Sequence, residues 1–148
     1  MKLRGFEVCS GYENNVVNIP KRQTFNSAGY DIEAIETVTI HPQEVVLVKT
    51  GLKAYMMPDE VLKIYIRSSI PLKKGLMLAN GVGVIDSDYY NNQQNDGHIM
   101  IPIYNFSNQL VIINKGEKIA QGIFEKYLVV DNDEPIMKIR TGGFGSSD

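Results

Sequence analysis

The sequence predicts an all-β domain, either a sandwich or a barrel, and three observations lead to this fold class. Short apolar runs rich in β-branched residues recur along the chain at intervals of roughly 8–12 residues. Clusters of Gly, Pro, Asn and Asp, which favour turns, separate these runs. Only one segment carries both a start and a stop signal for a helix.

The expected strands share alternating or β-branched apolar residues, as a half-buried strand prefers. In chain order they occupy residues 16–19, 38–40, 45–49, 61–66, 99–106, 110–113, 119–130 and 136–139. The single expected helix covers about residues 69–75. Ser69 can serve as its N-cap, and Gly75 ends it because glycine readily adopts the left-handed conformation of a C-cap.

Length and charge limit the class of protein. The 148 residues suit one domain, expected at residues 1–139, with a Gly-rich tail at 140–148. The net charge of −2 argues against a nucleic-acid partner. No apolar run approaches the roughly 20 residues of a membrane span, and the first residues show no signal-peptide pattern. The lone Cys9 favours the reducing cytoplasm, and we expect it to be a small buried hydrophobe near the start of a strand.

The stretch 80–89 is the most informative for chemistry. Strand-like Val84-Ile85 delivers two carboxylates and a ring, and in a strand Asp86 and Asp88 would face the same side. Paired carboxylates can share a proton, hold a metal or activate water. An Asp-rich hairpin turn is the simpler alternative.

Three other segments each have two interpretations. Arg67-Ser68-Ser69 opens the helix and suits a phosphate, or else supplies only an N-cap and a solvated charge. Asp31 is either a metal ligand or an exposed turn acid. The Gly-rich tail around Phe144 either covers a ligand or is a disordered terminus.

Taken together and in order, five segments resemble the five motifs of the trimeric deoxyuridine triphosphatase family. They are residues 28–34, 67–69, 80–89, 116–121 and 140–147. This resemblance implies a jelly-roll-like distorted β-barrel or sandwich, and a homotrimer whose sites lie between subunits. It also implies a Mg²⁺-dependent enzyme that hydrolyses dUTP to dUMP and pyrophosphate, which keeps uracil out of DNA and supplies dUMP for dTMP synthesis.

The resemblance assigns a role to each matching position. Asp86 matches the base that activates water against the α-phosphorus, and Asp31 matches an acid that holds Mg²⁺ through water. Tyr89 matches the ring that packs on deoxyribose and excludes a 2′-hydroxyl. Asn80 and the hairpin backbone up to Gly97 match the groups that recognise uracil. The remaining substrate contacts are matched by Arg67, Ser68, Ser69, Gln121, Arg140, Phe144, Gly145, Ser146 and Ser147.

The chain departs from the family pattern at three places. Residues 90–96 make a longer hairpin tip than is common in the family. Arg140 stands four residues before Phe144, one closer than in many members. The chain stops at Ser147-Asp148, where a Ser-Thr-Gly ending is more usual.

Two alternative functions compete with this interpretation. A dCTP deaminase would share the fold and the Arg-Ser-Ser motif, but it needs a glutamate where this chain has Pro102, and proline cannot transfer a proton. A regulatory protein that binds dUTP and another protein is the second alternative, with the polar tip 90–96 as its contact surface if the source is viral.

Overall fold

The computed structural model describes residues 1–145, and its architecture is all-β with one short helix. This confirms the predicted fold class. The described strands are β1 (Gly5–Val8), β2 (Tyr30–Glu33), β3 (Val38–Ile40), β4 (Val45–Lys49), β5 (Leu52–Tyr55), β6 (Glu60–Ile66), β7 (Leu76–Leu78), β8 (Gly83–Asp86), β9 (Met100–Asn105), β10 (Val111–Ile113) and β11 (Lys118–Lys126).

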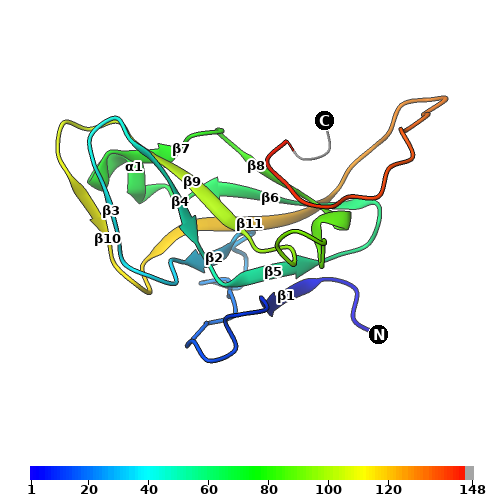
Figure 1. Ribbon diagram of the computed structural model, residues 1–148, viewed down its shortest axis with the longest axis horizontal. Coiled ribbons are helices and arrows are strands. Elements are labelled where there is room, and N and C mark those ends of the chain that lie inside the picture. The colour runs from blue at the N-terminus through cyan, green and yellow to red at the C-terminus, as the bar shows by residue number, and fades with distance from the viewer. Residues whose placement is uncertain (146–148) are drawn as a thin grey trace.

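Every described strand pairing is antiparallel, and the strands form four separate sheets (Figure 1). The largest has the order β2-β11-β6-β8, and a second has the order β4-β9-β7. Two-stranded sheets pair β1 with β5 and β3 with β10. Within residues 1–145 these sheets do not join into a closed barrel, so the sandwich-like form of the prediction applies.

The core lies between the sheets and is almost entirely aliphatic. Its fully enclosed side chains come from both larger sheets, and removing them from water is the main stabilising contribution. The most deeply buried are Ile32, Ile40, Val48, Leu52, Leu62, Leu76, Leu78, Ile99, Ile101, Ile103, Ile113 and Ile119.

Two predicted strands, 16–19 and 136–139, are wrong. Neither run pairs with a strand: residues 136–139 are all exposed, and of residues 16–19 only Val17 packs against the core. Apolar composition gives a strand only where a neighbouring strand and a buried face are available. β1, β2, β5 and β7 were missed because each is only three or four residues long, and β1, β2 and β5 also carry charged residues.

The helix α1 (Ser69–Lys74) is where it was expected, but its N-cap is Ser68 rather than Ser69. The Ser68 side chain makes no capping hydrogen bond, so the chain enters the helix directly from the end of β6. Gly75 ends α1 as predicted, with a φ of 66° and its amide bonded to the Pro71 carbonyl at 3.1 Å.

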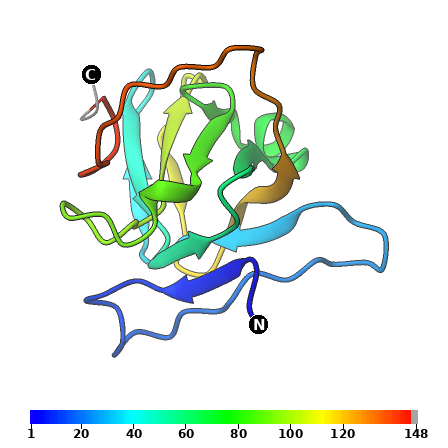
Figure 2. The ribbon, with the colours of Figure 1, turned by 90° about the vertical axis from the view of Figure 1, so that its right-hand side faces the viewer.

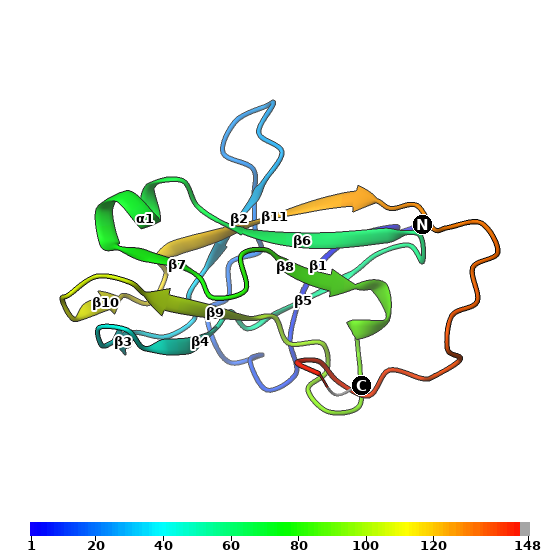
Figure 3. The same ribbon diagram turned by 90° about the horizontal axis from the view of Figure 1, so that it is seen from above.

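After β11 the chain has no regular structure in the described residues. The segment swings away from the sheets and returns beside the hairpin tip, as Figures 2 and 3 show from two directions. Residues 131–139 are all exposed. The Gln94 amide bonds the Thr141 carbonyl at 2.8 Å and fixes the point of return. No helix among the described residues combines the length and apolar character that crossing a bilayer requires.

Candidate active site

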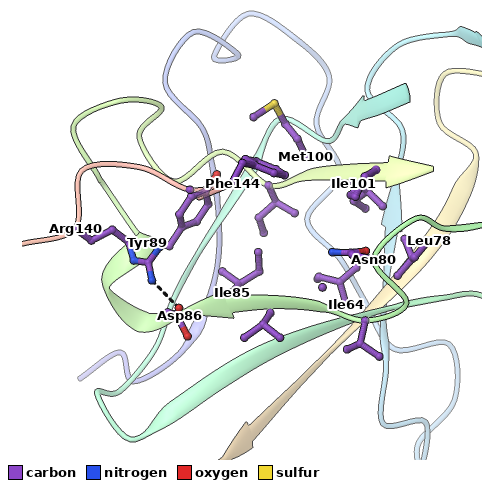
Figure 4. A pocket seen from close by; sticks show the side chains of 16 residues that line it. Ile64, Leu78, Asn80, Ile85, Asp86, Tyr89, Met100, Ile101, Arg140 and Phe144 are labelled. Carbon is purple, nitrogen blue, oxygen red and sulfur yellow. Dashed lines mark hydrogen bonds and ion pairs between the residues drawn. The ribbon is translucent and has the colours of Figure 1, made fainter. Parts of the chain in front are cut away.

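A cavity of about 350 Å³ opens between β8 and β9 (Figure 4). Its walls are mostly aliphatic, and its mouth carries an acid, an arginine and two aromatic rings. The lining residues are Ile64, Leu78, Asn80, Val82, Gly83, Val84, Ile85, Asp86, Tyr89, Ile99, Met100, Ile101, Pro102, Arg140, Gly143 and Phe144.

The cavity exists because two neighbouring strands do not pair. Within the described chain, β8 pairs only with β6, so its other edge is without a strand partner. β9 pairs with β7 only from Ile103 to Asn105, and the part of β9 before Ile103 lines the cavity. Backbone N–H and C=O groups of an unpaired edge must find other partners. The opening therefore offers peptide donors and acceptors between apolar walls.

Asp86 and Asp88 both face Arg140 at the mouth of the cavity. Arg140 donates from Nη2 to Asp86 Oδ2 at 2.7 Å and from Nε to Asp88 Oδ1 at 2.6 Å. The sequence correctly placed both acids on one side, but the reason differs. Asp86 ends β8, whereas Asp88 lies in a 3-10 turn, η1 (Ser87–Tyr89).

Tyr89 forms the wall beside these acids and is buried, with 5% exposure. Burial raises the pKa of its phenol, so the side chain stays neutral. The tail approaches this ring closely, because a Cβ added to Gly143 would lie 2.7 Å from Tyr89 Cε1. Phe144 follows at the mouth, 63% exposed, with a φ of 53°. The described part of the tail, which includes Gly145, therefore lies against the Tyr89 ring, and Gly143 and Phe144 line the opening.

The tip 90–96 is tied to the domain beneath it. Asp96 accepts hydrogen bonds from the Ser10 amide at 3.0 Å and from Lys53 Nζ at 2.9 Å. Burial alone would raise the pKa of Asp96, but these donors outweigh it and lower the pKa to about 2. His98 is buried below the tip, where its Nε2 accepts the Gly51 amide at 3.0 Å and burial lowers its pKa. Neither Asp96 nor His98 lines the cavity.

A second polar cluster gathers at the other end of β6. Arg67 Nε lies 3.4 Å from Asp31 Oδ1, and Arg67 also donates to the Lys118 carbonyl at 3.2 Å. Gln121 stands opposite Asp31 in the β2–β11 ladder, and its side chain lies against Gly29, where a Cβ would be 2.1 Å from Gln121 Oε1. Asp31 is therefore a partly enclosed acid on a strand, not an exposed turn acid.

Comparison with known proteins identifies the family. The dUTPase family model matches residues 15–148. The deoxyuridine 5′-triphosphate nucleotidohydrolase of Lactococcus lactis subsp. lactis (strain IL1403) is 58% identical over 148 residues, 99% of each chain. The chain belongs to the dUTPase family. A dUTPase structure from Streptococcus mutans superimposes with a TM-score of 0.81 at 45% identity, over 86% of this chain and 99% of that one.

A more distant relative supports the fold alone. The structure of a D95N mutant dUTPase from phage phi11 of S. aureus aligns with a TM-score of 0.73 at 22% identity, over 93% of this chain and 98% of that one. Its description mentions a structural Mg(II) ion in that protein. Membership of the dUTPase family makes the present chain a nucleotide hydrolase that acts on dUTP.

Within one dUTPase chain the predicted site residues form two groups. Asn80, Asp86, Tyr89, Arg140 and Phe144 meet at the cavity. The other group, at the far end of β6, contains Arg67, Asp31 and Gln121, with Ser68 and Ser69 following Arg67 in the chain. Gly97 is buried beneath the tip and is not among the cavity residues, and Ser146 and Ser147 lie outside the described residues.

The two groups of this dUTPase are far apart in a single chain. Asp86 stands opposite Val61 in the β6–β8 ladder, six residues before Arg67. At about 3.3 Å per strand residue this is roughly 20 Å, longer than a triphosphate group.

Sequence reasoning missed two parts of the site. The aliphatic lining of the cavity was missed because Ile64, Ile85 and Ile101 look like ordinary strand residues. Asp88 was not assigned a partner, because its contact with Arg140 joins residues 52 apart in the chain. The only signal for that contact in the sequence was the presence of two acidic residues within 86–88.

Proposed function

We propose that this chain hydrolyses dUTP by attack of a water on the α-phosphorus, with Asp86 as the general base. One observation carries the proposal: the Asp86 carboxylate, 49% exposed, lies at the rim of a cavity whose aliphatic walls suit the faces of a flat ring. A carboxylate within hydrogen-bond reach of a water can remove its proton as the oxygen attacks phosphorus. The products are dUMP and pyrophosphate.

The uracil ring of the substrate is proposed to lie between β8 and β9. Two unpaired strand edges present peptide donors and acceptors in fixed positions, which suits the alternating polar edge of uracil. Asn80 lies at the end of this opening opposite to Asp86 and Arg140, and it adds a side-chain amide (Figure 4). Cytosine presents the opposite pattern at two positions, N3 and the group on C4, so buried polar groups would remain unpaired and its binding would be weak.

Tyr89 and the tail are proposed to enclose the sugar and the base. The buried Tyr89 ring would pack on deoxyribose and leave no room for a 2′-hydroxyl. Phe144 would stack on the base when the tail closes, and closure excludes water from the reacting phosphate. Gly145, Ser146 and Ser147 would contribute phosphate contacts from the same tail.

Arg140 is proposed to exchange partners during binding. Its guanidinium bonds both Asp86 and Asp88, yet these carboxylates are 49% and 61% exposed, and exposed ion pairs are weak. A triphosphate carries more negative charge than two carboxylates and fits the planar donor face of arginine. Transfer of Arg140 to the phosphates would free Asp86 to hold the water.

The second group of residues is proposed to hold phosphates and Mg²⁺. Arg67, Ser68, Ser69 and Gln121 supply the donors. Asp31 fits a hydrated cation, because its Oδ2 is buried and has no hydrogen-bond partner within residues 1–145. When bound to the triphosphate, Mg²⁺ would neutralise charge that develops during phosphoryl transfer. Arg67 Nε, 3.4 Å from Asp31 Oδ1, would hold that carboxylate in place.

The separation of the two groups supports a site shared between copies of the chain. Roughly 20 Å along β6 separates Arg67 from the residue opposite Asp86, so one dUTP cannot contact both in one chain. A closed ring of identical chains would bring the Arg67 end of one copy to the Asp86 end of another. We therefore keep the homotrimer in the cytoplasm as the proposed form of the enzyme.

The decisive experiment measures pyrophosphate release from dUTP, dCTP, dTTP and UTP in parallel, first with Mg²⁺ and then with EDTA. We expect release from dUTP alone, and only with the metal. Release from dCTP or UTP at a similar rate would contradict the roles given to the strand edges and to Tyr89. No release from dUTP by the folded oligomer would favour the regulatory alternative, for which the tip 90–96 is the expected contact surface.

A further inference from the structure

The hairpin tip between Tyr89 and Gly97 folds inward around a buried asparagine. Asn92 is only 7% exposed. Its Oδ1 accepts the amides of Gln94 at 3.0 Å and Asn95 at 3.1 Å, and its Nδ2 donates to the Tyr89 carbonyl at 2.7 Å. Both ends of the Asn92 amide are therefore satisfied by groups of the tip itself, which gives this irregular segment one defined shape.

A second asparagine connects the tip to the ring of Tyr89. Asn95 Oδ1 accepts Asn92 Nδ2 at 2.7 Å and the Gly97 amide at 3.1 Å, which directs its Nδ2 toward Tyr89. That Nδ2 donates to Tyr89 Oη at 2.9 Å, and Tyr89 Oη in turn donates to the His98 carbonyl at 2.6 Å. Tyr89 is held at its carbonyl by Asn92 and at its hydroxyl by Asn95.

We propose that Asn95 is a positioning residue that sets how strictly the enzyme rejects ribonucleotides. This rests on the proposed role of Tyr89 as the wall of the sugar site. A ring can exclude one additional oxygen atom only if it cannot retreat by about 1 Å, and a displacement of that size changes reaction rates markedly. Asn95 opposes such a retreat of the Tyr89 ring, because its Nδ2 is hydrogen-bonded to the hydroxyl at the far end of the ring.

The tail side of the ring is closed as well. A Cβ at Gly143 would lie 2.7 Å from Tyr89 Cε1, so the ring has no spare space in that direction. The Asn95 hydrogen bond then decides whether the ring can move in the remaining direction, toward the tip. The longer tip is in this view a specificity element built around the sugar wall.

The test compares kcat/KM for dUTP and for UTP in the full-length chain and in two tip variants. Asn95→Ala should lower the ratio of dUTP to UTP roughly five- to tenfold, the value of about one hydrogen bond, mainly through a lower KM for UTP. The matched control is Gln93→Ala, because Gln93 is exposed and its side chain makes no hydrogen bond within residues 1–145. Its ratio should equal that of the unchanged chain.

Tyr89→Phe supplies the second arm, since it keeps the ring and removes the hydroxyl that Asn95 contacts. Because it also removes the bond to the His98 carbonyl, this variant should lose at least as much of the ratio as Asn95→Ala, and adding Asn95→Ala to it should change nothing further. Thermal midpoints are recorded for all variants. An unchanged ratio in Asn95→Ala, or an equal fall of both kcat/KM values, overturns the proposal. If Asn95→Ala does not fold, an unchanged ratio in Tyr89→Phe overturns it alone.

The two proposals fail in different ways. A chain that hydrolyses UTP as well as dUTP before any substitution contradicts the proposed role of Tyr89. A selective chain whose selectivity survives the loss of the Asn95 contact contradicts only the role of Asn95.

Discussion

The two ends of strand β6 hold their charged side chains in different ways. At the Arg67 end, the partner acid Asp31 has a side chain only 9% exposed, on strand β2 of the four-stranded sheet. At the cavity end, Arg140 comes from a segment without regular structure and binds two acids that are 49% and 61% exposed. The first arrangement is fixed by the sheet, and the second can be exchanged at small cost.

This difference separates preformed recognition from gated chemistry. In the proposed mechanism, donors at the Arg67 end are ready before substrate arrives, which would lower the entropy cost of binding. The proposed base Asp86 at the cavity end is bonded to Arg140, and it would be released only when a polyanion draws that arginine away. Three experiments test this difference between the two ends.

The largest expected effect comes from Asp86→Asn. Turnover of dUTP should fall by roughly 10²–10⁴-fold, because the amide cannot take a proton from water. Binding of dUTP should persist, because Arg140 keeps Asp88 as a partner in the free enzyme and can still move to the triphosphate. Pyrophosphate release and titration with a non-hydrolysable dUTP analogue measure the two quantities. Asp88→Asn is the matched control and should change turnover only severalfold; an equal loss in both variants would remove the distinction between the acids.

Deletion of residues 142–148 should have the next largest effect. Turnover should fall by roughly a hundredfold, because the reacting groups lose their cover and alignment. The thermal midpoint should move little, since Phe144 and Gly145 are exposed and the Gln94–Thr141 hydrogen bond remains. Scanning calorimetry alongside the activity assay checks both. A large fall in the midpoint would make the tail a part of the fold rather than a cover.

The smallest effect is a partial recovery. Chains carrying Asp86→Asn and chains carrying Arg67→Ala should each be inactive as pure oligomers. After mixed refolding in equal amounts, about a quarter of shared sites should combine an intact Asp86 with an intact Arg67 from a neighbouring copy. Recovery near that level supports a shared site, whereas a mixture as inactive as its components would place the whole site within one chain.

Much of the fold could be predicted because its signals are local. The runs that form β3, β4, β6 and β9 alternate or are β-branched, and Gly75 marks the end of α1. The failures share a physical cause. Residues 16–19 and 136–139 have strand-like composition but no neighbouring strand edge to pair with, and only Val17 among them packs against the core; the segment itself does not state whether such an edge is present.

The candidate site was predictable residue by residue but not as an arrangement. The motifs named Asp86, Tyr89 and Arg140, and these do meet at one cavity. The distance along β6 between the Asp86 and Arg67 groups depends on strand register, which the sequence does not state. The inward fold of the tip was also hidden, because Asn92 and Asn95 look like solvent-exposed turn residues until their amides are seen to bond Tyr89.

The gap between β8 and β9 has a cost as well as a use. An unpaired strand edge can be extended by a strand of another molecule, and this is a common start of aggregation. Here β8 is only four residues long and ends in the charged Asp86. The short length and the charge both make it a poor edge for another strand to pair with. The tail lies over the same opening. The backbone proposed to recognise the nucleobase is therefore also an unpaired strand edge, and a bound nucleotide would protect it from self-association.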